Sequence, residues 1–150
     1  MTALSHTALW QLIGGNPMEP RSMNAPLILI VEDNQTNARL MSDMLHAAGY
    51  STQTAHEGTQ GLNMARELQP TLIITDLQMA GMDGLTLTRR LKTEPVTMSI
   101  PVVAVTAHAM PEHQQEAFRA GCSAFITKPF RFRTLIDEIS HVLQSSTASG

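Results

Sequence analysis

Three carboxylic acids in this sequence stand where apolar runs end. Glu32 and Asp33 directly follow one apolar run, and Asp76 directly follows another. If both runs are parallel strands, the three carboxyl groups lie at the same edge of a sheet. Clustered carboxylates repel one another and are stabilised by a hard divalent cation such as Mg²⁺, which prefers oxygen ligands. Because Mg²⁺ commonly binds one or two carboxylates together with phosphate oxygens, the three acids predict a magnesium site that accepts a phosphoryl group.

A hydroxyl and an ammonium group are predicted at the same edge. Thr106 follows a third apolar run and Lys128 a fourth. Both side chains suit phosphoryl oxygens, and a carboxylate can act as a nucleophile that forms an aspartyl-phosphate. Phosphoryl transfer depends mainly on positioning and on neutralising charge, which a metal and a lysine provide. We therefore predict that Asp76 is the nucleophile. A single acid after a strand is more often a turn former or a helix cap, so this interpretation depends on the combination.

Five strands and five helices are needed to position these residues. Apolar and largely branched runs predict three strands buried on both faces. A more polar segment predicts a second strand along the chain, and a short segment before Lys128 predicts the last one. Helical periodicity follows each strand, and glycine or proline ends the first four of these helices. The predicted strands are 27–31, 50–55, 72–75, 102–105 and 124–126, and the predicted helices lie within 40–48, 62–68, 85–91, 111–120 and 135–143. This alternation predicts a right-handed, doubly wound α/β domain with a parallel sheet.

The composition predicts one folded domain. The chain has 150 residues, of which 43% are hydrophobic and 15% charged, and its net charge of −3 favours neither disorder nor a general attraction to nucleic acid. The single cysteine, Cys122, excludes an internal disulfide and fits a cytoplasmic location. No apolar run approaches the roughly 20 residues that cross a bilayer. We expect a flexible leader at 1–25, one domain at 26–143 and a disordered tail at 144–150, which leaves no room for an output domain and predicts output by protein contact.

The chain resembles the receiver domains of two-component response regulators over residues 26–143, through the stretches LILIVEDN, ITDLQMAGMDG, VVAVTAHAM and GCSAFITKPF. The resemblance implies a flavodoxin-like (βα)5 sandwich whose five parallel strands have the order 2-1-3-4-5. It also implies that Asp33 and Asp76 ligate Mg²⁺, that Glu32 helps through water, and that Gln78 contributes its backbone carbonyl. Asp76 would then receive its phosphoryl group from a histidine kinase or a histidine phosphotransfer protein.

The resemblance further implies a conformational switch and not an enzyme, beyond self-phosphorylation and autodephosphorylation. Lys128 would contact the phosphoryl group, Thr106 would swing toward it, and the aromatic ring of Phe125 would turn inward. These movements would remodel a surface on the fourth helix, fifth strand and fifth helix, which would bind a downstream protein. The bond between Lys128 and Pro129 would be the family's cis peptide.

Two positions depart from the family pattern, and two others lie where receivers control the phosphoryl lifetime. Ala80 stands where many receivers have proline, which predicts a looser loop after Asp76. Phe125 replaces a tyrosine and offers no hydroxyl to a partner. Gln78 and His108 occupy positions beside the path of attacking water in receivers, so we hypothesise that they set the lifetime of the aspartyl-phosphate.

Other functions remain open at this point. A phosphorylation-independent adaptor would keep the fold without the switch, although the complete set of acids, Thr106 and Lys128 disfavours it. A magnesium-dependent phosphatase of the haloacid dehalogenase type would carry a second aspartate two residues after the first, where this chain has Gln78. A flavin or dinucleotide binder would need a glycine-rich loop after the first strand. The chain could also be a receiver excised from a hybrid kinase, and its kinase, target and oligomeric state are not determined by the sequence.

Overall fold

Five strands alternate with five helices in the computed structural model, which describes residues 25–149. The elements agree in type and order with those predicted. Helices α3 and α4 begin earlier than their apolar periodicity indicates, because their first turns are polar and carry no such signal. In chain order the elements are β1 (Leu27–Val31), α3 (Gln35–Ala47), β2 (Ser51–Ala55), α4 (Gly58–Leu68), β3 (Leu72–Asp76), α5 (Gly84–Thr93), β4 (Val102–Thr106), α6 (Pro111–Ala120), β5 (Ala124–Thr127) and α7 (Phe132–Ser149).

The closing helix is longer than predicted. We expected a disordered tail from residue 144, but α7 continues to Ser149. Residues 144–149 contain neither proline nor glycine, so nothing in their sequence stops the helix. Of the predicted leader, residues 1–24 lie outside the described part of the chain. No helix within residues 25–149 is long and apolar enough to span a membrane.

The sheet is parallel throughout, with the strand order β2-β1-β3-β4-β5. This confirms the predicted flavodoxin-like order. The register pairs Val31 with Thr75, and Asp76 with Val105. As a result, β1, β3 and β4 end at nearly the same level, and the residues that follow them share one edge of the sheet.

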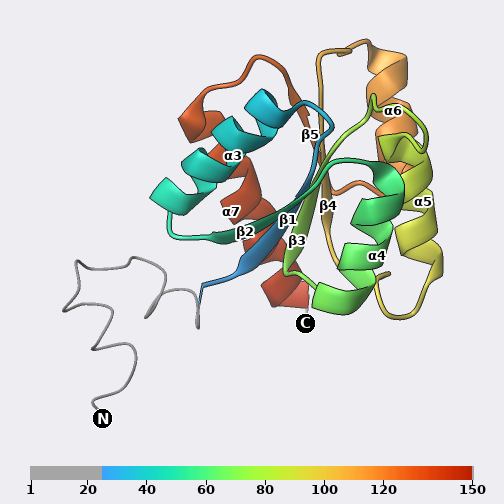
Figure 1. Ribbon diagram of the computed structural model, residues 1–150, viewed down its shortest axis with the longest axis horizontal. Coiled ribbons are helices and arrows are strands. Elements are labelled where there is room, and N and C mark those ends of the chain that lie inside the picture. Colours follow the sequence, from blue (N-terminus) through green and yellow to red (C-terminus); the bar gives the residue numbers. More distant parts are fainter. Residues whose placement is uncertain (1–24, 150) are drawn as a thin grey trace.

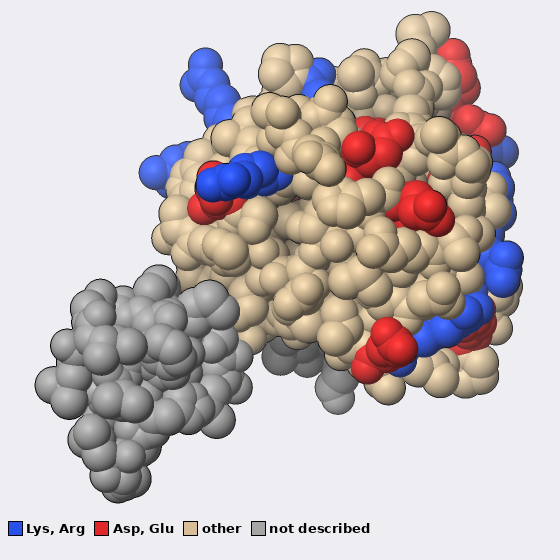
Figure 2. Space-filling model, in the orientation of Figure 1, with Lys and Arg blue, Asp and Glu red and all other residues tan. Residues whose placement is uncertain are grey.

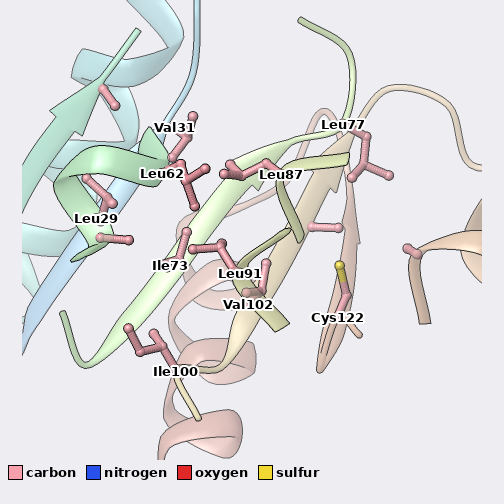
Figure 3. Packing of buried hydrophobic residues seen from close by; sticks show 14 residues of the cluster. Leu29, Val31, Leu62, Ile73, Leu77, Leu87, Leu91, Ile100, Val102 and Cys122 are labelled. Atoms are coloured by element: carbon pink, nitrogen blue, oxygen red, sulfur yellow. The ribbon is translucent and has the colours of Figure 1, made fainter. Parts of the chain in front are cut away.

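Two layers of helices cover the sheet. Figure 1 shows α3 and α7 on one face and α4, α5 and α6 on the other. The central strands supply both cores, because alternate side chains point to opposite faces: in β1, Ile28 and Ile30 pack under α3 and α7, whereas Leu29 and Val31 pack under α4 and α5. The second of these cores, which includes Leu62 and Leu91, is drawn in Figure 3. Each fully buried aliphatic side chain contributes about 1.5–3 kcal/mol, so this double burial fixes the strands that carry the site.

Short polar side chains begin the two helices that follow the acidic residues. The Asn37 backbone N–H donates to Oδ1 of Asn34 at 2.9 Å, at the start of α3. The Thr86 backbone N–H donates to Oδ1 of Asp83 at 2.8 Å, at the start of α5. Each cap satisfies a helix N–H that has no partner within the helix, which contributes about 1 kcal/mol. The loops after β1 and β3 are therefore anchored at both ends.

Candidate functional site

Side chains from four strand ends meet at the carboxyl edge of the sheet. Glu32 follows β1, Asp76 is the last residue of β3, Thr106 is the last residue of β4, and Lys128 follows β5. In open α/β sheets, ligands bind outside this edge, where the strand order reverses. Here the reversal falls between β1 and β3, the two strands that carry the acids. The structure therefore brings together the residues that the sequence singled out.

The three carboxylates form one cluster. Oxygen atoms of Glu32, Asp33 and Asp76 all lie within 4.8 Å of one another. Glu32 is 1% exposed and Asp76 is 7% exposed, whereas Asp33 is open to solvent. An all-oxygen donor set with one open side has the chemistry that a hard cation such as Mg²⁺ requires, and it leaves room for the water or phosphate ligands that this ion retains. The residues present thus fit a magnesium ion.

Lys128 bridges the two buried acids. Its Nζ donates to Oδ2 of Asp76 at 2.8 Å and to Oε1 of Glu32 at 3.0 Å. Burial is the largest single influence on Lys128 and lowers its pKa, but the hydrogen bonds to Asp76 and Glu32 reverse this and raise the pKa above 10.5. Burial raises the pKa of Glu32 above its ordinary value, against the opposing hydrogen bond from Lys128. The ammonium group thus stays charged and holds two carboxylates that would otherwise repel each other.

Backbone N–H groups orient the carboxylates. The Gln78 N–H donates to Oδ1 of Asp76 at 3.0 Å. The Ala80 N–H lies 3.4 Å from Oδ2 of Asp33, so the loop after β3 also reaches the loop after β1. A proline at position 80 has no N–H and could not make this contact. The alanine that we expected to loosen the loop therefore supplies a tether of its own.

Gly84 allows the loop after Asp76 to fold back on itself. Its N–H donates to the Leu77 carbonyl at 3.1 Å. A Cβ atom at this position would clash with the Asp76 carbonyl oxygen and lie 2.8 Å from the Leu77 Cα, both of which belong to the backbone and cannot swing aside. The sequence indicated only a loop rich in glycine. The close approach to Asp76 depends on the tertiary structure.

We expect Gly84→Ala to destabilise the domain by about 2 kcal/mol, because overpacking against backbone outweighs the better helix propensity of alanine. Gly81→Ala is the matched control. Gly81 lies in the same loop, and a Cβ atom added there would meet open space. Its φ of +76° disfavours alanine, so we expect this variant to lose about 1 kcal/mol of stability. Urea unfolding of the two variants measures the difference. A Gly84→Ala variant as stable as the native protein would show that the loop does not need the close approach.

Thr106 and Phe125, for which the resemblance implies a switch, lie on the neighbouring strands β4 and β5. Thr106 is buried, and its Oγ1 accepts a hydrogen bond from the His108 backbone N–H at 3.2 Å. Phe125 is half-buried and packs against the core under α4, α5 and α6. The bond between Lys128 and Pro129 is cis, as the resemblance implied. The hydroxyl, the aromatic ring and the lysine therefore lie on the neighbouring strands β4 and β5.

A pocket of about 510 Å³ opens beside the cluster, between the loop after β3 and helix α6. Asp33, Gln78 and Thr106 form part of its lining, together with His113 and Glu116 of α6. No role was predicted for His113 or Glu116 from the sequence. Their spacing of three residues places both on one side of a helix, but only the tertiary structure shows that this side faces the site.

Residues 28–140 match the family model for the response regulator receiver domain. This chain belongs to that family. The receiver is 39% identical over 116 residues to the polar-differentiation response regulator DivK of Brucella anthropi, an alignment that covers 77% of this chain and 94% of that protein. DivK of Brucella ovis is equally similar. Five parallel strands in the observed order and the match to the family model agree with the fold and family predicted from the four sequence stretches.

Solved structures of similar proteins also include receiver domains. One from a signal transduction histidine kinase of Syntrophus aciditrophicus is 34% identical with a TM-score of 0.75, and the match covers 81% of this chain and 92% of that one. Another, from a sensor histidine kinase of Pseudomonas aeruginosa, is 27% identical with a TM-score of 0.70, and the match covers 81% and 96% of the two chains. That second structure has a magnesium ion coordinated in its active-site cleft.

Proposed function

We propose that this receiver accepts a phosphoryl group on Asp76 in a magnesium-dependent reaction and signals through a changed protein-binding surface. The observation that carries the proposal is the position of the Asp76 carboxylate. One oxygen accepts from Lys128 and the other from the Gln78 N–H, and the group lies in a cluster with Glu32 and Asp33. A carboxylate that is oriented at both oxygens, and of whose side chain 10% is exposed, is suited to attack phosphorus.

The residues of the cluster have different roles in this reaction. Asp33, Asp76 and the Gln78 carbonyl would bind Mg²⁺, with Glu32 acting through water, and the ion would neutralise charge on the phosphoryl oxygens. An Asp76 oxygen forms the new bond to phosphorus as the bond to the donor's imidazole nitrogen breaks. Lys128 holds a phosphoryl oxygen through its ammonium group, and the Thr106 hydroxyl turns to another. The magnesium-bound receiver from Pseudomonas aeruginosa supports the choice of metal.

The donor would be a histidine kinase or a histidine phosphotransfer protein, and the recipient of the signal a downstream protein. The surface of α6, β5 and α7 suits such a protein because it exposes large apolar side chains. Met110 is 55% exposed, Phe118 49% and Phe132 44%. On the described part of the face in Figure 2, Lys and Arg lie interspersed with Asp and Glu, which offers no broad basic surface for a nucleic acid. We propose residues 26–143 as the functional unit.

The first test is intact-mass spectrometry after incubation with acetyl phosphate, with Mg²⁺ or with a chelator. We expect one phosphoryl adduct in the presence of Mg²⁺ and none in the chelated sample, because the clustered carboxylates need the cation to admit a phosphoryl group. The absence of an adduct under both conditions would favour the phosphorylation-independent adaptor. Release of phosphate over many turnovers would instead favour the phosphatase.

We propose that Gln78 and His108 set the lifetime of the aspartyl-phosphate, because both exposed side chains line the pocket beside the acid cluster and would screen it from attacking water. Gln78→Ala and His108→Ala are each expected to speed dephosphorylation by about tenfold, which corresponds to about 1.4 kcal/mol. The loss of adduct with time after removal of acetyl phosphate measures the rate. Glu116→Ala, at the α6 side of the same pocket, should leave the rate unchanged. If Gln78→Ala and His108→Ala both dephosphorylated at the native rate, neither residue would set the lifetime of the aspartyl-phosphate.

A further inference from the structure

The loop between β4 and α6 is tied to the rest of the domain through His108. All four residues of the loop, 107–110, are exposed. The His108 backbone N–H donates to Oγ1 of Thr106 at 3.2 Å, at the end of β4. The His108 ring meets the His113 ring edge to face, with ring centroids 5.8 Å apart and planes at 76°. His108 therefore connects the switch hydroxyl on one side to the first turns of α6 on the other.

Packing, and not a hydrogen bond at Nδ1, positions the buried side of the His113 ring. His113 is the third residue of α6 and is half-buried, and its Nδ1 atom is buried without a hydrogen-bond partner in the described part of the chain. A ring with no polar contact at that nitrogen is positioned by its neighbours, of which His108 is one. Edge-to-face ring pairs contribute modestly but set orientation, since their energy depends on the angle between the rings.

The two histidines do not form a preorganised metal site. Within residues 25–149, the one group of three His, Cys, Asp or Glu side chains whose ligand atoms lie within 4.8 Å of one another is Glu32, Asp33 and Asp76. Glu116 lines the same pocket as both histidines without completing such a group. The ring contact is therefore the interaction that links the pair.

We propose that His113 is a positioning residue which, through its ring contact, holds His108 beside Thr106 and so couples the phosphorylation site to the first turn of α6. We name this contact the histidine clasp. It deepens the proposed function and rests on it, because Thr106 is the group that would respond to the phosphoryl oxygen. A Thr106 hydroxyl that turns toward that oxygen leaves the His108 N–H. The clasp still holds the His108 side chain at the pocket after this backbone contact is lost.

The clasp can be tested before any phosphorylation, by NMR measurement of hydrogen exchange at the His108 amide. His113→Ala is expected to speed this exchange by about three- to tenfold, the range that the loss of one edge-to-face ring contact allows. His113→Phe keeps a ring and should exchange like the native protein. Glu116→Ala removes another side chain from the same pocket and is the control. The proposal would be overturned if the His108 amide exchanged at the native rate in His113→Ala. It would also be overturned if Glu116→Ala accelerated this exchange as much as His113→Ala does.

A second measurement separates the clasp from the proposed function. After charging with acetyl phosphate, His113→Ala should speed dephosphorylation in the same direction as His108→Ala, and the double variant should decay no faster than His108→Ala alone. His113→Phe should restore the native rate. Additive effects of the two alanine substitutions would overturn the clasp. A native protein that takes no phosphoryl group would refute the proposed function, while the exchange measurement would still decide the clasp.

Discussion

Asp76→Asn is expected to abolish the phosphoryl adduct completely. The amide keeps the size of the side chain, and its single oxygen can still accept one of the two hydrogen bonds that Lys128 and the Gln78 N–H donate to Asp76, so the fold should be retained. It cannot supply a carboxylate oxygen to phosphorus, which removes the nucleophile itself. Intact-mass spectrometry with acetyl phosphate and Mg²⁺ measures the result, and circular dichroism checks that the variant is folded.

Asp83→Asn provides the matched control for this variant. Asp83 also lies in the loop after β3 and lines the pocket, but its carboxylate is occupied in capping α5. Asparagine is about as good a helix cap as aspartate, so this variant should form the adduct as the native protein does. An adduct that persisted in Asp76→Asn would place the phosphoryl group elsewhere. Peptide mapping would then identify the residue.

Lys128→Met is expected to destabilise the receiver by about 2 kcal/mol at neutral pH without metal. Removing one partner of a buried ion pair leaves uncompensated charge, which typically costs about 3–5 kcal/mol. The expected loss is smaller because Glu32 can take up a proton and because Asp76 retains its hydrogen bond from Gln78. Urea unfolding monitored by circular dichroism measures the difference. The same variant should form little or no phosphoryl adduct, because the ammonium group no longer neutralises phosphoryl charge.

The effect of Lys128→Met should depend on pH in a defined direction. The pKa of Glu32 is raised in the folded state, so its ionisation costs stability as the pH rises above 4.5, and the loss of Lys128 increases this cost. Lowering the pH through the raised pKa of Glu32 protonates this side chain. The difference in the free energy of unfolding between Lys128→Met and the native protein should then become smaller. The pKa of Lys128 is raised above 10.5, so its own contribution is present below that value and is lost as the pH rises through the raised pKa.

Two further variants test this explanation. Adding Glu32→Gln to Lys128→Met removes one of the two carboxylates left without their ammonium partner, and should recover part of the lost stability. Arg133→Met removes a positive charge from an exposed position just beyond the site and should change stability by less than about 0.5 kcal/mol. Equal stability of Lys128→Met and the native protein would mean that the bridge contributes nothing to the fold.

The sequence by itself determined the class of fold and the types of residue at the site. Runs such as 27–31 and 102–105 are short, apolar throughout and rich in branched side chains, which indicates strands covered on both faces. Their alternation with helical patterns restricts the chain to a parallel sheet with right-handed crossovers. The strand order needed the family resemblance, since alternation alone fits several orders.

The tertiary structure decided what depends on distances between residues far apart in the chain. Lys128 bridges Glu32 across 96 positions and Asp76 across 52, and no local pattern encodes such contacts. The same reason explains why no role was predicted for His113, and why the contact of the Ala80 N–H with Asp33 was not foreseen, since both depend on the folded domain. Periodicity and turn chemistry act over a few residues and fix which side chains arrive at the sheet edge. Packing of the two helix layers fixes which of those side chains touch.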